Sequence, residues 1–264
     1  MMRCTGLLVV VALAIASSGV QTAPRPALSH VEGATPVIVE LFTSEGCSDC
    51  PPADTLLEKL LATQPVAGAE IIGLGEHVDY WDRLGWKDRF SSAAVTSRQQ
   101  RYQTRFRTES IYTPQMVVDG AAEFVGSDAA AARKAIEKTL AAPHGRLNID
   151  LASAAVHVTV SDLPPLPRGD RADIIVMVTE RGLATDVKRG ENHGKVLAHA
   201  PVVRYLATIG QIADGANSGA ATAGEIALAP DWRRDHLAVV AFVQQQRGRA
   251  ILAAASAPLQ NARP

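Results

Sequence analysis

Hydrophobic positions follow two different periodicities along the chain, and the change falls near residue 143. Before it, runs rich in β-branched residues alternate with segments in which apolar residues recur every three or four positions. The first run, residues 37–42, has the length and composition of a buried strand. The helix predicted next has an apolar stripe made of Ala53, Leu56, Leu57, Leu60 and Leu61. Further strands are expected at residues 71–74, 115–118 and 123–125, and further helices at residues 93–106 and after Ser127-Asp128.

The part after residue 143 has the alternating pattern of an all-β fold. Polar and apolar residues alternate at 147–151 and 156–160, and three more strands are expected at 173–178, 237–243 and 249–255. Residues 201–211 fit a short helix rather than a strand, and residues 211–224 fit a flexible loop. We therefore predict an α/β domain at residues 35–142, followed by a smaller β-rich, sandwich-like domain at residues 144–260.

The first 23 residues have the features of a secretory signal peptide. Arg3 precedes an apolar run at residues 7–16, and small residues with Ala-x-Ala spacing are present. The run is about half as long as a helix that spans a bilayer. We expect a periplasmic or secreted protein with no membrane segment after signal cleavage. Cys4 would leave with the signal, so that Cys47 and Cys50 remain in an oxidising environment.

The composition excludes one class of function. The 264 residues are enough for about two domains, and 47% of them are hydrophobic, so the chain can form a core. Lysine and arginine total 26 against 27 acidic residues, a net charge of -1. The chain therefore lacks the basic excess of a nucleic-acid-binding protein, and no local basic cluster is apparent along the sequence.

The two cysteines lie where a helix start favours a thiolate. Cys47 and Cys50 stand between the first predicted strand and helix, and Pro51 and Pro52 suit a first turn because that turn needs no backbone donors. Unpaired N–H groups at the helix start stabilise an anion, so the Cys47 thiol should ionise more easily than a free thiol. Cys50, one turn further, can then attack a mixed disulfide formed on Cys47. This arrangement predicts thiol–disulfide exchange with a protein or small-molecule substrate and no bound cofactor.

The spacing of the two cysteines is also compatible with three roles that involve no thiol exchange. A structural disulfide is one, although such a short loop constrains the unfolded chain little. Half of a zinc site is another, although the sequence has no second cysteine pair or HxxxH motif to complete it. Coincidence is the third.

A second motif, Thr113-Pro114, stands directly before a predicted strand. Proline cannot donate to a sheet, so its position calls for a reason. A cis peptide bond before Pro114 would expose the Thr113 backbone for pairing with an extended partner chain opposite the cysteines. An ordinary trans proline at a strand edge is the alternative.

The order of these motifs resembles the thioredoxin superfamily: strand, CSDC, helix, strand, helix, Thr-Pro, hairpin, helix. More closely, VELFTSEGCSDCPPAD, HVDYWDRLGWKDRFS and YTPQMVVDG look like a secreted, thioredoxin-like bacterial family of unknown function. The likeness covers residues 35–140 and extends less specifically through ENHGKVLAHAPVVRYL. It implies a thioredoxin fold with Cys47 as attacking thiol, Cys50 as resolving thiol and Pro114 as a cis proline. It implies no known substrate.

Further residues have candidate roles, and the role of Glu40 follows from this resemblance. Glu40 lies on the strand where many thioredoxin-like proteins carry an acid that moves a proton to or from the resolving thiol; an outward-facing carboxylate is the alternative. Trp81 fits the wall of a substrate groove beside Cys47, or a cap on the core. His77 fits a hydrogen bond within its loop with Asp79, whereas copper or zinc handling would use it together with the cysteines. A solvated face is the interpretation for the arginines along the next predicted helix, and a surface for an acidic partner is the alternative. These arginines are Arg98, Arg101, Arg105 and Arg107.

Charges near Cys47 bear on the direction of the redox reaction. Glu45 and Asp49 flank it, and two like charges about 7 Å apart cost roughly 1–2 kcal/mol at surface-like dielectric. That cost is similar to the gain from the helix start, about 0.3–2 kcal/mol. A moderately stabilised thiolate predicts a reductase or isomerase-like enzyme rather than a strong oxidant. A binding module that has lost the chemistry, and a metal-handling protein, remain the alternatives.

Overall fold

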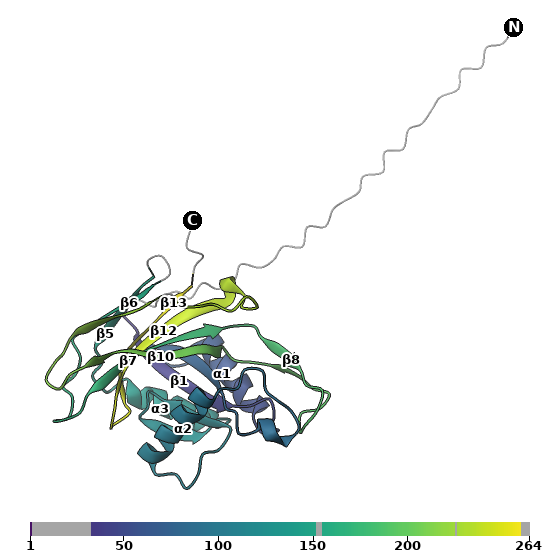
Figure 1. The fold of residues 1–264 in the computed structure, drawn as a ribbon, viewed down its shortest axis with the longest axis horizontal. Helices are drawn as coiled ribbons and strands as arrows, with labels where there is room; N and C mark the ends of the chain where they lie inside the picture. Colours follow the sequence, from purple (N-terminus) through teal and green to yellow (C-terminus); the bar gives the residue numbers. More distant parts are fainter. Residues whose placement is uncertain (2–32, 152–154, 225, 260–264) are drawn as a thin grey trace.

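The computed structural model describes Met1 and residues 33–151, 155–224 and 226–259. The expected signal peptide therefore lies outside the described residues, apart from Met1. None of the helices in the described ranges has the length and apolarity that a bilayer crossing requires. The protein has a mixed α/β fold dominated by one large mixed sheet (Figure 1).

The first part of the chain alternates strands and helices as the periodicity predicts. β1 (Thr35–Thr43) pairs in parallel with β2 (Ala69–His77) and antiparallel with β3 (Gln115–Val118), which forms a hairpin with β4 (Ala122–Val125). The connecting helices are α1 (Pro51–Thr63), α2 (Ala93–Phe106) and α3 (Ala129–Thr139), with the short η1 (Asp82–Leu84) before α2.

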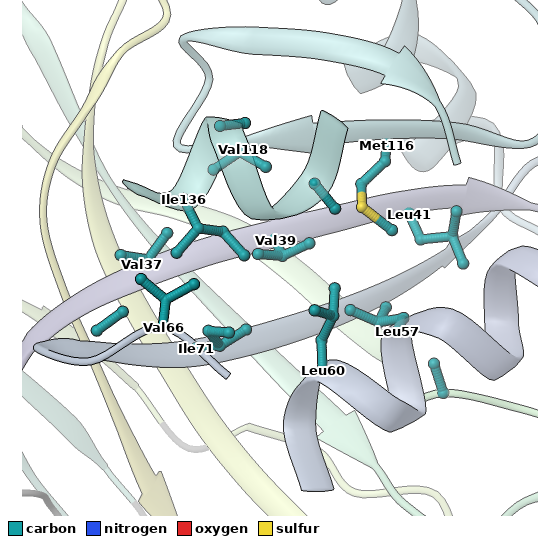
Figure 2. Close-up of a cluster of buried hydrophobic side chains, with 14 of the residues drawn as sticks. Val37, Val39, Leu41, Leu57, Leu60, Val66, Ile71, Met116, Val118 and Ile136 are labelled. Atoms are coloured by element: carbon teal, nitrogen blue, oxygen red, sulfur yellow. The ribbon is translucent and has the colours of Figure 1, made fainter. Parts of the chain in front are cut away.

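Side-chain alternation along β1 places different helices on the two faces of the sheet. Val39 and Leu41 point to one face and pack with Leu57 of α1 and Ile136 of α3, as Figure 2 shows. Phe42 points to the other face and packs with residues of α2. The sheet thus separates the surroundings of α1 from those of α2, and this separation decides which polar residues meet the cysteines.

The strands of the second part extend the same sheet. Its order is β13-β12-β7-β10-β2-β1-β3-β4, and a separate three-stranded sheet has the order β11-β6-β5. The added strands are β7 (Ala172–Glu180), β10 (Val202–Ile212), β12 (Leu237–Gln245) and β13 (Ile251–Pro258). The smaller sheet consists of β5 (Arg146–Asp150), β6 (Val156–Ser161) and β11 (Gly219–Ala223), and its apolar side chains pack on those of β7 and β12. The remaining short elements are β8 (Ala184–Asp186), β9 (Val196–Ala198) and η2 (Arg234–His236).

Two expectations about the second part need correction. Residues 202–212 form the strand β10 rather than a short helix, and residues 219–223 of the expected loop form β11. The boundary near residue 144 does not separate two sheets, because β10 pairs in parallel with β2 through Val202 and Gly75. Gly75 suits this junction because a Cβ there would lie 3.1 Å from the Pro201 carbonyl oxygen, which also accepts the Gly75 N–H at 2.7 Å.

Candidate functional site

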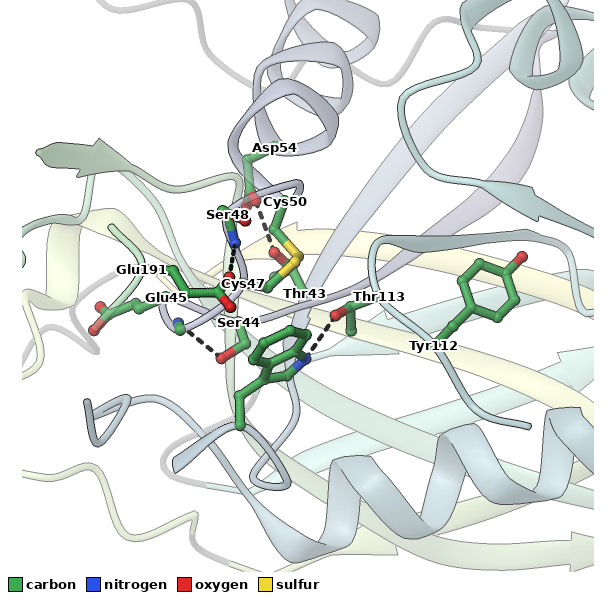
Figure 3. The surroundings of a disulfide bond; sticks show 12 residues. Thr43, Ser44, Glu45, Cys47, Ser48, Cys50, Asp54, Tyr112, Thr113 and Glu191 are labelled. Carbon is green, nitrogen blue, oxygen red and sulfur yellow. Dashed lines mark hydrogen bonds between the residues drawn. A yellow bond between two sulfur atoms is a disulfide. The ribbon is translucent and has the colours of Figure 1, made fainter. Parts of the chain in front are cut away.

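The cysteine motif lies between the end of β1 and the start of α1, as the sequence predicts. Cys50 is the N-cap of α1, and the two prolines after it occupy the first helical positions. Cys47 therefore lies before the helix rather than at its start, and Cys50 is not one turn inside it as expected. Cys47 and Cys50 form a disulfide with their Cα atoms 5.4 Å apart (Figure 3). A disulfide at this position is compatible with export of the protein.

Both cysteines are covered, with only 1% of each residue exposed, whereas the predicted thiol exchange needs a reachable sulfur. The β8–β9 loop (residues 187–195) is hydrogen-bonded to the main chain around Cys47. Its Asn192 is fully buried, and the Asn192 side-chain amide donates to the carbonyl oxygens of Glu45 and Cys47, each at 2.9 Å. In the same loop, Glu191 accepts the N–H of Ser48 at 3.1 Å. A segment about 145 residues away in the sequence therefore holds the cysteine loop in its present conformation.

The Thr-Pro motif lies beside the end of β1. The peptide bond between Thr113 and Pro114 is cis, which confirms that expectation. Register pairs Phe42 with Gln115, so Pro114 stands level with the last residue of β1. The indole N–H of Trp81 donates to the Thr113 hydroxyl at 2.8 Å, and a Cβ on Gly46 would approach the Trp81 Cβ at 3.2 Å. Trp81 thus connects the Thr-Pro turn to the cysteine loop.

Glu40 is not placed for the proton transfer suggested for it. Its side chain lies on the α2 face of the sheet, where it accepts hydrogen bonds from Arg98 at 2.5 Å and from the Tyr102 hydroxyl. Burial raises the pKa of Glu40, but the charge of Arg98 and the hydrogen bonds from Arg98 and Tyr102 outweigh it and lower the pKa, whereas proton transfer needs a raised value. Arg98 is itself fully buried, contrary to the expected solvated face. Glu40 therefore belongs to a buried ionic network on the face of the sheet opposite α1.

Asp54, which was not among the predicted site residues, is a buried acid beside Cys50. It is on α1, 5% exposed, and accepts a hydrogen bond from the Thr43 hydroxyl at 2.8 Å. Asp54 and Cys50 line one small pocket together with His199. Burial raises the pKa of Asp54, opposed by the charges of His77 and His199 and by the Thr43 hydrogen bond. The sequence could have indicated the burial of Asp54, because its spacing from Leu57 and Leu61 places it on the apolar face of the helix.

His77 ends β2 and points toward the same region from the sheet. Its Nδ1 lies 2.6 Å from a carboxylate oxygen of Asp88, not of Asp79, which instead accepts from the Thr96 hydroxyl. The Asp88 carboxylate outweighs the opposing effect of burial and raises the pKa of His77. The expected loop hydrogen bond therefore exists with a different partner.

Arginines gather in a groove elsewhere on the molecule, which corrects the expectation of no local basic cluster. The groove lies between α2 and the turn before β13, and Arg105 donates to the Gly248 carbonyl oxygen across it at 2.6 Å. The arginines that line it are Arg101, Arg105, Arg107, Arg168, Arg247 and Arg249. The cluster forms only on folding, since its members come from three separate parts of the sequence.

A family model for a protein of unknown function (DUF1223) matches residues 38–244, which include the cysteine loop and strands of both parts but not β13. The chain belongs to the DUF1223 family. A crystal structure from Agrobacterium tumefaciens resembles this DUF1223 protein with 25% identity and a TM-score of 0.64, covering 88% of this chain and 97% of that one. HBP35 of Porphyromonas gingivalis is similar in fold, with 13% identity, a TM-score of 0.61 and coverage of 88% and 77%. No curated protein matches the DUF1223 chain significantly.

Proposed function

We propose that the protein is an exported thiol–disulfide oxidoreductase of the thioredoxin type, acting as a reductase or isomerase. The strand order β2-β1-β3-β4, with helices on both faces, supports a thioredoxin-like arrangement of residues 35–142. The observation that carries the proposal is the Cys47–Cys50 pair at the start of α1, with buried Asp54 lining the same pocket as Cys50. We place the enzyme in the periplasm or outside the cell.

The proposed reaction uses both cysteines in turn. In the reduced protein, the Cys47 thiolate attacks a substrate disulfide, forms a mixed disulfide and releases one substrate thiolate. The Cys50 thiol then loses its proton to Asp54 and attacks the Cys47 sulfur, which releases the second substrate thiolate. Two electrons pass from the protein to the substrate, and a dithiol donor restores the reduced protein. Isomerase action needs no net electron transfer, because Cys47 is released when the substrate forms a new disulfide.

Substrate access requires movement of the β8–β9 loop. Asn192 and Glu191 hold the main chain around Cys47, so a bound substrate must displace them or find them displaced. Thr113 and Trp81 would then border the exposed sulfur and position the substrate backbone. The second part of the chain thereby controls which substrates reach the cysteines.

Insulin reduction by dithiothreitol tests the proposal. We expect catalysis in the wild type, none in Cys47→Ser, and an accumulated mixed disulfide in Cys50→Ser. Asp54→Asn should slow the resolution of the mixed disulfide by Cys50 about 100-fold, because general base catalysis contributes a factor of 10²–10⁴ to such rates. Asp49→Asn is the control, since it changes an exposed carboxylate and should leave this rate unchanged. Equal rates for wild type and both cysteine variants would refute the proposal.

A second candidate is a binding module whose disulfide has no redox role. The 1% exposure of both cysteines favours it. This candidate predicts a disulfide that stays intact under mild reductant and no mixed disulfide with any substrate. The insulin assay on the same variants separates it from the enzyme.

A further inference from the structure

Three buried side chains converge beneath the cysteine loop from three different elements. Asp54 comes from α1, His77 from the end of β2 and His199 from the residues after β9, and they are 5%, 1% and 5% exposed. Each offers a metal-ligating atom, and these atoms lie within 4.8 Å of one another. We propose that Asp54, His77 and His199 form a binding site for a divalent transition-metal ion, for which zinc is the best match.

Two atoms of these ligating groups are buried without a hydrogen-bond partner, although each group has a partner at its other polar atom. Within the described ranges, neither His77 Nε2 nor Asp54 Oδ1 has one. Buried polar atoms in folded proteins almost always have partners, so two unpartnered atoms in one small cluster of ligating side chains indicate a missing shared partner. An ion that accepts both lone pairs satisfies them together.

The second nitrogen of His77 is already held in the way metal-binding histidines are held. Its Nδ1 lies 2.6 Å from Asp88, whose side chain is fully buried. Asp88 also accepts the backbone N–H groups of Glu45 and Phe90, at 2.9 and 2.8 Å, so it stays ionised and fixed in place. A carboxylate on Nδ1–H directs the Nε2 lone pair to a metal and makes it a better donor. Asp88 therefore acts as a positioning residue.

His199 has only long contacts to its neighbours. Its Nε2 lies 3.3 Å from the Thr185 hydroxyl and 3.3 Å from Glu45 Oε1. The rings of His199 and His77 meet edge to face with centroids 5.1 Å apart. His199 is therefore close to the other two ligands without a short bond that would have to break first.

The ligand types select the class of ion. Two imidazole nitrogens with one carboxylate oxygen suit zinc and neighbouring transition metals, whereas calcium and magnesium prefer oxygen donors throughout. Three protein ligands leave a fourth position, and the pocket lined by Asp54 and His199 continues to Cys50. The site differs from a metal-handling pair of cysteines, because it is complete when they are joined in the disulfide.

The test uses the full mature chain with its disulfide intact, so that thiolates cannot bind metal. After chelator treatment, we expect one equivalent of Zn²⁺ to bind per chain and raise the melting temperature. Co²⁺ should give visible bands without a thiolate charge-transfer band. His77→Gln and His199→Gln should each weaken Zn²⁺ binding at least about 100-fold. His157→Gln, a change at a histidine of β6 in the smaller sheet, is the matched control and should bind like the wild type.

Absence of a zinc-dependent rise in the wild-type melting temperature would overturn the inference even if the histidine variants failed to fold. Binding unchanged in both folded variants would also overturn it, as would binding confined to the reduced protein. Asp54 takes part in both proposals, as base in the zinc-free protein and as ligand in the zinc-bound one, but their tests are separate. Zinc binding without insulin reduction would refute only the redox proposal, and insulin reduction without zinc binding would refute only the zinc site.

Discussion

Asn192→Ala tests whether the β8–β9 loop controls access to the disulfide. The wild-type amide donates two hydrogen bonds, at 2.9 Å each, to the main chain of Glu45 and Cys47, and all three residues are at least 99% buried. Alanine leaves both carbonyl oxygens without this donor. An unsatisfied buried group costs about 1–3 kcal/mol. Taking about 1–2 kcal/mol for each carbonyl oxygen, the two together cost roughly 2–4 kcal/mol.

That free energy should appear mainly as easier opening of the loop. Reduction of a covered disulfide depends on the fraction of molecules that are open. Each 1.4 kcal/mol changes this fraction about tenfold, so a cost of 2 kcal/mol predicts roughly 30-fold faster reduction of Cys47–Cys50.

The assay is reduction by excess dithiothreitol, followed by alkylation and mass spectrometry of quenched samples. Asn148→Ala is the control, since Asn148 is an exposed asparagine on β5. Urea unfolding of each variant separates loop opening from global destabilisation. A folded Asn192→Ala protein that is reduced at the wild-type rate would refute the role assigned to the loop.

Three further changes probe other parts of the molecule. Glu40→Gln should lower the free energy of unfolding in urea by about 3 kcal/mol, because Arg98 loses its closest buried counter-ion. Slower thiol exchange in the folded variant would contradict the purely structural role of Glu40. Gly120→Ala should lower stability by at least about 2 kcal/mol in the same titration, because φ is +62° and the new Cβ would lie 1.9 Å from a backbone carbonyl oxygen; an unchanged midpoint would contradict this. The hydrogen bond to Asp119 raises the pKa of His144, so its stabilisation is present below the ordinary histidine pKa and lost as pH rises through the folded value. His144→Gln should therefore cost on the order of 1 kcal/mol at acidic pH and less at alkaline pH, and a cost that grows with pH would be the wrong sign.

Local signals predicted the first strand, the first helix and the position of the cysteines between them. Apolar spacing and two prolines define these elements within a few residues, so no distant partner is needed to find them. Glu40 shows that nearness in the sequence does not establish contact with the cysteines. It precedes Cys47 by seven residues, but strand alternation turns it to the α2 face, while Thr43 turns to α1 and meets Asp54.

Nonlocal contacts account for the features that the sequence pattern did not reveal. β10 was expected as a short helix because its pairing with β7 has two register shifts, after Val203 and after Thr208, which break the alternation of a regular strand. Asn192 and His199 reach the cysteine loop only because β8 and β9 bring them there. Neither residue belongs to a motif with fixed spacing, so one sequence alone does not reveal them.

The parallel junction of β2 with β10 has a consequence for how the chain folds. β2 ends at residue 77 and its partner begins at residue 202, so the edge of β2 at Gly75 stays unpaired until a segment made much later in synthesis is available. Such a high-contact-order pairing slows folding and leaves an aggregation-prone edge on early intermediates. A fragment that stops near residue 142 should accordingly aggregate rather than behave as an autonomous unit.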